Sequence, residues 1–575
     1  MKTNTVYKKK DIKERLLALY SEEEATQAEV LIIQMIAAYH DKIESKPYKM
    51  TQEDVILITY GDQVIEPSVE PLQTLGKFLD AHIKDIINTV HILPFYPYSS
   101  DDGFSVIDYK DVSPRMGSWD DIEALSKNYN LMFDGVINHI SQYSYWFKSF
   151  LENNPKYANF FVEVDPSVDL SMVVRPRALP LLHEYKDIDD KSRFIWTTFS
   201  KDQVDLNYAN YHVMIAVLDV LLFYVQKGAK LIRLDAIAFL WKELGTDCIH
   251  LPQTHEAIQL MREVIHEVAP EVVIITETNV PHDENISYFG SGDDEAQMVY
   301  NFALPPLAAH TILSGDTTAL NKWAKSLTLP SDKVCFFNFI ASHDGCGVRP
   351  VAEVLSENEL GRIIENVEAN GGYVSYRGLS DGGKAPYELN ASFIDIVASK
   401  RDDLVTRAKK FMLVQAMKLA MPGVPGIYFH SLVGSTSDID GVRRSGVLRS
   451  INREKLNYDV LNEELAQEGS LRALVFEEYR HLLTLRKVES AFDPYGDFEV
   501  LALGEGLFSL LRLSKDDNFN ILSINNFTNQ SIFFQLPSSI KESAIELIKN
   551  KIILTNSIKI EAYQTMWIKF DKGMK

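Results

Sequence analysis

Eight short and strongly apolar segments, separated by stretches of helical length, run through the middle of this chain. They are VILITY (55–60), VHILPF (90–95), LMFDGVI (131–137), AKLIRLDAI (229–237), VVIITET (272–278), QMVYNF (297–302), VCFFNFI (334–340) and GVPGIYF (423–429). Strands that are apolar on both faces are typical of a parallel sheet covered by helices. Eight alternations of strand and helix fit a closed barrel. We therefore predict an α/β protein built on a (β/α)8 TIM barrel.

Segments outside these strands predict further parts around the barrel. Apolar clusters at LLALY (16–20) and VLIIQMIAAY (30–39) indicate an N-terminal helical extension. Two gaps between strands are too long for a single helix, so we expect an inserted small domain after the third strand and a loop insertion after the seventh. The last part of the chain alternates as antiparallel strands do. The predicted division is a helical extension over 1–50, a catalytic barrel over 51–496 with insertions at about 142–210 and 345–405, and a C-terminal β domain over 497–575.

Composition limits the class of protein further. At 575 residues, with 46% hydrophobic and 24% charged residues, the chain is expected to form more than one globular domain. Its net charge of −22 disfavours nucleic acid and acidic membranes as partners. Three cysteines (Cys248, Cys335 and Cys346) do not form a disulfide framework and indicate a reducing compartment. Because we find neither a signal peptide nor an apolar segment of membrane-spanning length, we expect a soluble, cytoplasmic protein.

Polar side chains follow four of the predicted strands. They are Asp134, Asn138 and His139 after the third strand, Arg233 and Asp235 in the fourth, Glu277 and Asn279 after the fifth, and His343 and Asp344 after the seventh. The carboxyl ends of barrel strands meet on one rim, so Asp235, Glu277 and Asp344 are expected to converge there. Crowding raises the pKa of at least one carboxyl group, and a pair with one protonated and one ionised member is what glycoside cleavage requires. Arg233 points to the same face as Asp235 and would keep it ionised.

The segments that carry these residues resemble the four conserved stretches of the α-amylase superfamily, glycoside hydrolase family 13. They are DGVINH (134–139), RLDAIAF (233–239), TETN (276–279) and ASHDG (341–345). Segments that resemble its sucrose-phosphorylase branch are LITY (57–60), HILPFYPYSSDDGFSVIDY (91–109), RPRALP (175–180) and RSINR (449–453). Within that branch, three segments resemble the glucosylglycerate phosphorylases. They are TETNVPH (276–282), GSGDDEAQMVYNFALPPL (290–307) and GTDCIHL (245–251). The resemblance implies a retaining enzyme that acts on α-glucosides without a metal ion or a cofactor.

The resemblance also implies roles for individual residues. Asp235 is expected to be the nucleophile, Glu277 the general acid and then base, and Asp344 the residue that holds two sugar hydroxyls and stabilises the transition state. Other expected glucose-binding residues are His139, His343, Arg233 and Phe104, with Asp101 and Arg449 pairing to close the far end of a one-sugar pocket.

Two loops at the mouth are expected to hold phosphate and the acceptor. In this branch an arginine and a tyrosine, here Arg177 and Tyr387, lie on mobile loops, and a guanidinium suits phosphate. Sucrose phosphorylases commonly carry tyrosine where this chain has Phe239 and histidine where it has Asn279, which weakens the case for fructose as acceptor. A carboxylated acceptor such as glycerate needs a cation, for which Arg177, Lys384 and Arg377 are candidates.

The implied function is reversible phosphorolysis of 2-O-α-D-glucosyl-D-glycerate to α-D-glucose 1-phosphate and D-glycerate, through a covalent β-glucosyl-aspartate. Alternatives within the same chemistry are sucrose, sucrose 6′-phosphate and glucosylglycerol phosphorylases. An α-glucoside hydrolase differs only in whether water or phosphate reaches the intermediate, and a non-catalytic binding homologue is the most distant alternative. The expected partners are small molecules only, and the chain is expected to be a monomer or a homodimer.

Overall fold

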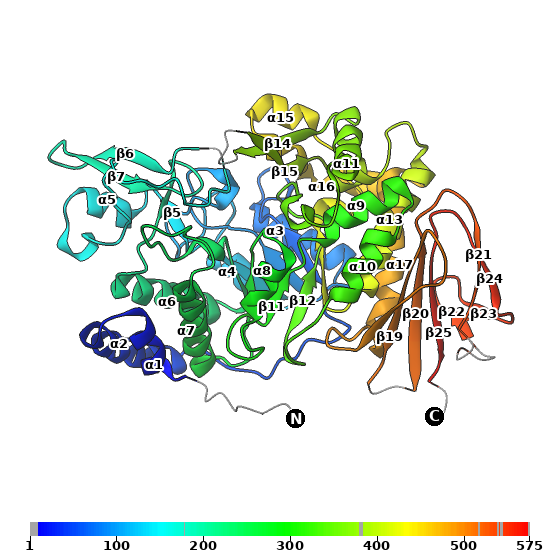
Figure 1. Ribbon diagram of the computed structural model, residues 1–575, viewed down its shortest axis with the longest axis horizontal. Coiled ribbons are helices and arrows are strands. Elements are labelled where there is room, and N and C mark those ends of the chain that lie inside the picture. Colours follow the sequence, from blue (N-terminus) through cyan, green and yellow to red (C-terminus); the bar gives the residue numbers. More distant parts are fainter. Residues whose placement is uncertain are drawn as a thin grey trace.

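The computed structural model describes residues 10–177, 179–378, 383–515, 518–537, 540 and 544–572. At its centre lies a closed barrel of eight parallel strands, and each strand overlaps one of the eight predicted segments (Figure 1). The strands are β1 (Ile56–Thr59), β3 (Thr89–Ile92), β4 (Asn130–Gly135), β9 (Ala229–Leu234), β10 (Val273–Thr276), β11 (Met298–Tyr300), β12 (Cys335–Asn338) and β16 (Val424–Tyr428). Neighbouring strands follow chain order, and β16 closes the barrel against β1. The predicted fold class is confirmed.

Helices surround the barrel strands. They are α3 (Pro71–His82), α4 (Trp119–Ser126), α6 (Tyr211–Gln226), α7 (Pro252–Val268), α9 (Leu304–Ser314), α10 (Thr318–Ser326), α13 (Leu404–Ala420) and α17 (Leu471–Lys487). Local sequence sets their ends. At α6, the Asn210 side chain accepts a hydrogen bond from the backbone N–H of His212, which caps the helix. Gly228 then adopts a φ of 99°, and the chain turns directly into β9.

The insertion after β4 forms a small region beside the barrel rim. Its elements are β5 (His139–Ser141), α5 (Tyr145–Leu151), η2 (Pro155–Tyr157), β6 (Leu182–Lys186), β7 (Ser192–Trp196) and β8 (Gln203–Asp205). Strands β6 and β7 form an antiparallel hairpin, and β5 pairs with β8. Val164, Leu181 and Trp196 form a separate apolar cluster with Cys248 of the barrel. This packing holds the insertion against the loop that follows β9.

The insertion after β12 covers the same rim from another side. Its elements are β13 (Cys346–Gly347), η5 (Arg349–Val351), α11 (Glu357–Ala369), β14 (Tyr373–Gly378), β15 (Lys384–Asn390) and α12 (Phe393–Val397). Because β15 pairs with both β13 and β14 in one antiparallel sheet, the hairpin is tied to the residues directly after Asp344.

Shorter elements complete the loops around the barrel. They are β2 (Val64–Ile65), η1 (Asp101–Gly103), η3 (Ile237–Phe239), α8 (His282–Ile286), η4 (Ser287–Phe289), α14 (Phe429–Leu432), α15 (Ile439–Ser445), η6 (Leu448–Asn452), β17 (Leu456–Asn457), α16 (Tyr458–Ala466) and η7 (Ser490–Phe492).

The N-terminal extension packs on two barrel helices, at the lower left of Figure 1. It consists of α1 (Ile12–Leu19) and α2 (Glu22–His40), and these helices contact α6 and α7. Both begin with a capping box, in which Asp11 or Ser21 and the glutamate three residues later exchange hydrogen bonds with the backbone. Arg15 of α1 forms an ion pair with Glu256 of α7 at 3.1 Å.

The C-terminal region forms antiparallel sheets beside the barrel, at the right of Figure 1. Strand order in the larger sheet is β18-β19-β20-β25-β22-β23, and β21 pairs with β24. The strands are β18 (Phe498–Leu501), β19 (Leu507–Leu513), β20 (Phe519–Asn526), β21 (Ile532–Gln535), β22 (Ala544–Glu546), β23 (Lys551–Ile553), β24 (Ser557–Ile560) and β25 (Thr565–Asp571). Strands β20 and β25 contact α13, so this sheet is anchored to the barrel on the side of α13 and α17.

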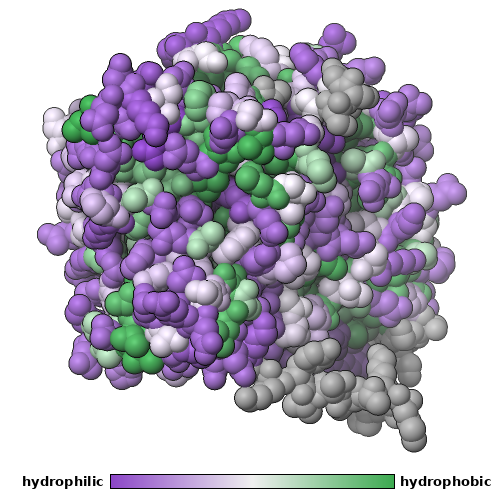
Figure 2. Space-filling view, turned by 60° about the vertical axis from the view of Figure 1, so that its left-hand side comes forward, coloured by the Kyte–Doolittle hydropathy of each residue, from purple (hydrophilic) through white to green (hydrophobic). Residues whose placement is uncertain are grey.

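The face of the molecule drawn in Figure 2 is mostly hydrophilic, as expected for a chain with a net charge of −22. Within the described residues, no helix combines the length and the apolar character needed to cross a membrane.

Candidate active site

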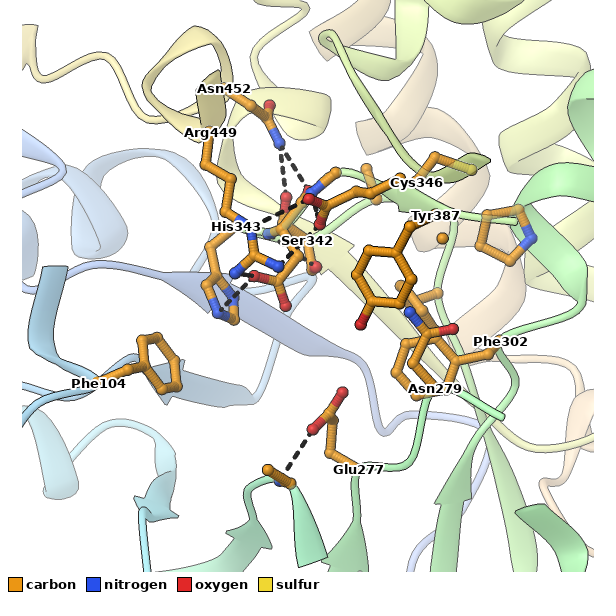
Figure 3. A pocket seen from close by; sticks show the side chains of 18 of the residues that line it. Phe104, Glu277, Asn279, Phe302, Ser342, His343, Cys346, Tyr387, Arg449 and Asn452 are labelled. Carbon is orange, nitrogen blue, oxygen red and sulfur yellow. Dashed lines mark hydrogen bonds and ion pairs between the residues drawn. The ribbon is translucent and has the colours of Figure 1, made fainter. Parts of the chain in front are cut away.

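A pocket at the carboxyl ends of the barrel strands brings most of the predicted site residues together (Figure 3). Predicted residues that line it are Asp101, Phe104, His139, Arg177, Asp235, Glu277, Asn279, His343, Asp344, Tyr387 and Arg449. Arg233 lies buried beneath the pocket, and Phe239 lines a neighbouring cavity instead. Segments from 101 to 449 in the sequence therefore meet in one place because the barrel collects the strand ends.

Arg233 organises the floor of the pocket. It lies on β9 directly opposite Asp134 of β4, and the two form a fully buried ion pair. Asp134 is held from the other side by His91, at 2.6 Å. The Arg233 guanidinium contacts Asp235 at 2.8 Å and lies 3.7 Å from Glu277. One cation thus stands beneath both carboxylates that would do the chemistry.

Glu277 points up into the pocket from the end of β10. Its Oε2 accepts a hydrogen bond from the backbone N–H of Ala236 at 3.0 Å. Ala236 has a φ of 50°, a left-handed conformation that costs a non-glycine residue about 1 kcal/mol and fixes the direction of this N–H. Burial raises the pKa of Glu277 to about 7, with Arg233 opposing the shift and Asp235 and Asp344 adding to it. A carboxyl group with this pKa can give and take a proton near neutral pH.

The other two carboxylates have different environments. Burial also raises the pKa of Asp235, although the contact with Arg233 opposes this effect. Burial pushes the pKa of Asp344 in the same direction, but the cations Arg449 and Arg453 outweigh it and hold that pKa well below its usual range. Arg449 Nη1 lies 2.5 Å from Asp344 Oδ1. Asp344 is therefore a permanent anion, whereas Glu277 is the group that titrates.

Aromatic rings form one side of the pocket. Phe104 stacks on the His343 ring with centroids 4.7 Å apart and planes within 3°. Burial lowers the pKa of His343 to about 3, so this imidazole is neutral at physiological pH. His139 Nε2 lies 2.9 Å from the carbonyl oxygen of Phe104, which can only accept, so the proton is on Nε2. Flat apolar surface beside neutral imidazole rings is suited to a sugar ring.

The ion pair expected between Asp101 and Arg449 is not formed among the described residues. Asp101 instead contacts Arg177 at 3.2 Å and lies 3.8 Å from Arg453. Arg449 contacts Asp344 and also Glu388, the latter at 2.9 Å. Asp101 and Arg449 both line the pocket and interact through their charges without direct contact, because Asp344 and Glu388 lie nearer to the arginine.

The mouth of the pocket is formed by the two insertions. Tyr387 of β15 and Asn279 both line the pocket, and in the view of Figure 3 they lie on the side opposite Phe104, with Glu277 below and between. Arg177 stands at the mouth, where its guanidinium lies 5.6 Å from the centre of the Phe199 ring. Lys384 and Arg377 lie on the β14–β15 hairpin and do not line this pocket within the described part of the chain.

Sequence reasoning missed two residues that shape the pocket. Glu388 binds Arg449 through both carboxylate oxygens and accepts the backbone N–H of Gly345 at 2.9 Å. Arg453 donates to Asp102 at 2.7 Å and to the backbone carbonyl of His343 at 2.8 Å. The sequence does offer a signal for each of these residues. Glu388 directly follows Tyr387, and Arg453 is the last residue of the RSINR segment.

The chain resembles proteins of known family over most of its length. The sequence model of the α-amylase catalytic domain matches residues 79–349. A glucosylglycerate phosphorylase from Spirochaeta thermophila is 47% identical over 528 residues, which is 90% of this chain and 89% of that protein. A glucosylglycerate phosphorylase from Escherichia coli is 43% identical, over 95% of this chain and 97% of that protein.

The chain belongs to the α-amylase family. Its four motifs predicted this membership, and the prediction is confirmed. The fold of this α-amylase family member is also that of a sucrose 6F-phosphate phosphorylase from Thermoanaerobacter thermosaccharolyticum. The two structures align with a TM-score of 0.73 and 22% sequence identity, over 90% of this chain and 99% of the other.

Proposed function

We propose that this chain is a retaining glucosylglycerate phosphorylase that converts 2-O-α-D-glucosyl-D-glycerate and phosphate to α-D-glucose 1-phosphate and D-glycerate. The observation that carries the proposal is the pocket itself, in which a titrating Glu277 and an arginine-bound Asp235 face the same space. Identity of 43–47% to proteins named glucosylglycerate phosphorylase, over 82–97% of their length, supports this substrate.

In the first step an oxygen of Asp235 attacks the anomeric carbon while the bond to glycerate breaks. Glu277 gives its proton to the departing oxygen, and a β-glucosyl ester of Asp235 results. In the second step a phosphate oxygen attacks the same carbon, the ester bond breaks, and the carboxylate of Glu277 takes the proton of hydrogen phosphate. Two inversions return the α configuration.

Asp344 acts on the sugar between these steps. Its charge is fixed by Arg449, so it can bind two ring hydroxyls of glucose and stabilise the positive charge that develops on the ring. Asp101, His139, His343 and Phe104 line the remaining wall and hold one glucose unit. A pocket with charged residues behind a single sugar favours release of one terminal residue over cleavage within a polymer.

Phosphate has to be preferred to water in the second step. Arg177 is the guanidinium at the mouth of the pocket, and Tyr387 is a neutral hydroxyl, because burial raises its pKa to about 12. Together they can bind a phosphate dianion in line with the anomeric carbon. A hydrolase would need no such cation, which is why we place the phosphorylase ahead of it.

We also propose that the chain divides near residues 50 and 497, with insertions at about 142–210 and 345–405. Both insertions contribute to the mouth, through Arg177 and Tyr387 respectively. Loops of this kind can determine substrate specificity while the barrel beneath them stays the same.

The reaction run in reverse tests the proposal. Purified protein is given α-D-glucose 1-phosphate with D-glycerate, glycerol, fructose or fructose 6-phosphate, and phosphate release is followed. Of these acceptors, we expect only D-glycerate to give rapid release of phosphate. Release with another acceptor would correct the substrate but keep the chemistry. Slow acceptor-independent release would indicate a hydrolase.

A further inference from the structure

A second, smaller cavity opens next to the glucose pocket. The two share the residues Phe199, Ala236, Glu277, Asn279 and Tyr387. Glu277, the proposed proton donor, therefore borders both. The second cavity therefore lies on the side of Glu277, where the acceptor departs in the proposed mechanism.

Arg349 provides the positive charge of the second cavity. It begins η5, directly after β13, and its side chain is 20% exposed. Phe239 and Val280 form apolar parts of the wall, so the guanidinium shares the cavity with apolar side chains. Burial lowers the pKa of Arg349, as does the positive charge of Arg377 nearby.

The guanidinium of Arg349 lacks a close anionic partner. Its nearest carboxylate is Glu284 of α8, whose Oε2 lies 3.9 Å from Nη2, beyond hydrogen-bonding distance. Glu284 is 44% exposed and lies nearer to His250, at 3.2 Å. In the described part of the chain, the half-buried Arg349 side chain donates no hydrogen bond, and its ion-pair contact is the long one to Glu284.

We propose that Arg349 binds the carboxylate of the acceptor and so makes the enzyme specific for a small hydroxy acid. The inference rests on the proposed function, and it names a residue that was not among the predicted cations Arg177, Lys384 and Arg377. A guanidinium binds a carboxylate through two parallel hydrogen bonds, which an apolar wall strengthens. With Glu277 at one end and Arg349 in the same cavity, the hydroxyl and the carboxylate of glycerate each meet a complementary group.

Arg349 and Arg177 line different cavities. Arg177 lines the glucose pocket and contacts Asp101, whereas Arg349 lines the second cavity and not the glucose pocket. Glycerate and phosphate place one oxygen each, in turn, at the anomeric carbon beside Glu277, so the two arginines differ in which of these molecules' remaining oxygens they bind. Glu284 is the internal competitor of the acceptor, because its carboxylate is the one that Arg349 faces in the free enzyme.

The test uses Arg349→Gln, which removes the charge and keeps a polar side chain of moderate length, and Arg349→Lys, which keeps the charge without the planar fork. Synthesis from α-D-glucose 1-phosphate is measured with D-glycerate and with glycerol, which differ only in the carboxylate. For Arg349→Gln we expect kcat/KM for D-glycerate to fall about 30-fold or more, while activity with glycerol changes less than about threefold. Arg349→Lys should lie between the wild type and Arg349→Gln. An equal loss with both acceptors would overturn the proposal.

Three further variants sharpen the comparison. Glu284→Gln removes the competing carboxylate, so the KM for D-glycerate should fall about two- to fivefold. Arg362→Gln makes the same substitution at an exposed arginine of α11 and should change nothing. If Arg377→Gln abolishes use of D-glycerate and Arg349→Gln does not, the carboxylate is bound on the hairpin and the proposal is wrong.

A binding measurement separates this inference from the proposed function. Calorimetric titration of D-glycerate into the wild type and Arg349→Gln needs no turnover. Binding that is at least about 30-fold weaker in the variant supports Arg349 even if phosphate release fails. Equal binding to both proteins, or no binding to the wild type, overturns the inference even if phosphorolysis is observed with another glucoside.

Discussion

The ionisation of Glu277 governs how the reaction should depend on pH. Burial raises its pKa from 4.5 to about 7. With this pKa about nine-tenths of the enzyme carries the proton at pH 6 and about one-tenth at pH 8, so kcat/KM for the glucoside should fall about tenfold between them. With an ordinary pKa the fall would be about a hundredfold. Because kcat/KM for the glucoside reports the free enzyme, the ionisation of phosphate does not enter.

Comparison of two substrates isolates the proton donor. Glucosylglycerate needs a proton on its leaving oxygen, whereas α-glucosyl fluoride releases fluoride without one. Kinetics are measured from pH 5 to pH 9 for the wild type and Glu277→Gln. We expect the loss of rate above pH 7 only with glucosylglycerate. We also expect Glu277→Gln to lose about 10³-fold with glucosylglycerate and far less in fluoride release. The reasoning is refuted if the rate with α-glucosyl fluoride also falls above pH 7. It is likewise refuted if kcat/KM for glucosylglycerate falls a hundredfold from pH 6 to pH 8.

The same shift predicts a change in stability. A carboxyl group whose pKa is raised on folding stabilises the folded state at low pH, and this contribution is lost as the pH rises from about 4.5 to about 7. Ionised Glu277 then costs about 3 kcal/mol. Glu277→Gln should therefore be more stable than the wild type at pH 8, and closer to it at pH 5, in chemical denaturation. A variant that is less stable at both pH values would contradict the pKa assigned to Glu277.

Three other substitutions test the remaining roles. Asp235→Ala should abolish turnover, since no ester can form, and a retained burst of glucosyl transfer from rapid-quench measurements would contradict this role. Arg177→Gln should lower phosphorolysis about tenfold or more while leaving slow hydrolysis nearly unchanged, and equal losses would mean that it only positions its loop. Glu388→Gln weakens the clamp on Arg449, so the KM for the glucoside should rise about tenfold with a smaller change in kcat. An unchanged KM would show that Asp344 holds Arg449 without help.

The barrel and the meeting of three carboxylates at its rim could be predicted because both follow from local pattern. A strand buried on both faces has to be apolar throughout, so each of the eight strands is visible as an uninterrupted run. Residues at the ends of such strands necessarily share one rim. For that reason Asp235, Glu277 and Asp344 were predicted together although they are far apart in the sequence.

Loop residues could not be paired in the same way. Asp101 and Arg449 were expected to form an ion pair, yet the fold gives each of them nearer partners. Glu388 and Arg349 escaped notice because each depends on an insertion whose path over the rim has no sequence period. Phe239 shares a small cavity with Glu277, and only the structure shows that this cavity is separate from the pocket lined by Asp235 and Asp344.

The sequence by itself determined the barrel, the family motifs and the identity of the groups that would do the chemistry, since these depend on hydrophobic pattern and on position along a strand. The tertiary structure alone decided which carboxyl group titrates near neutral pH. Glu277 and Asp344 are both acidic residues at strand ends. Burial dominates the pKa of Glu277, whereas the charges of Arg449 and Arg453 outweigh burial at Asp344. These arginines lie more than a hundred residues after Asp344 in the sequence, and only the fold brings them next to it.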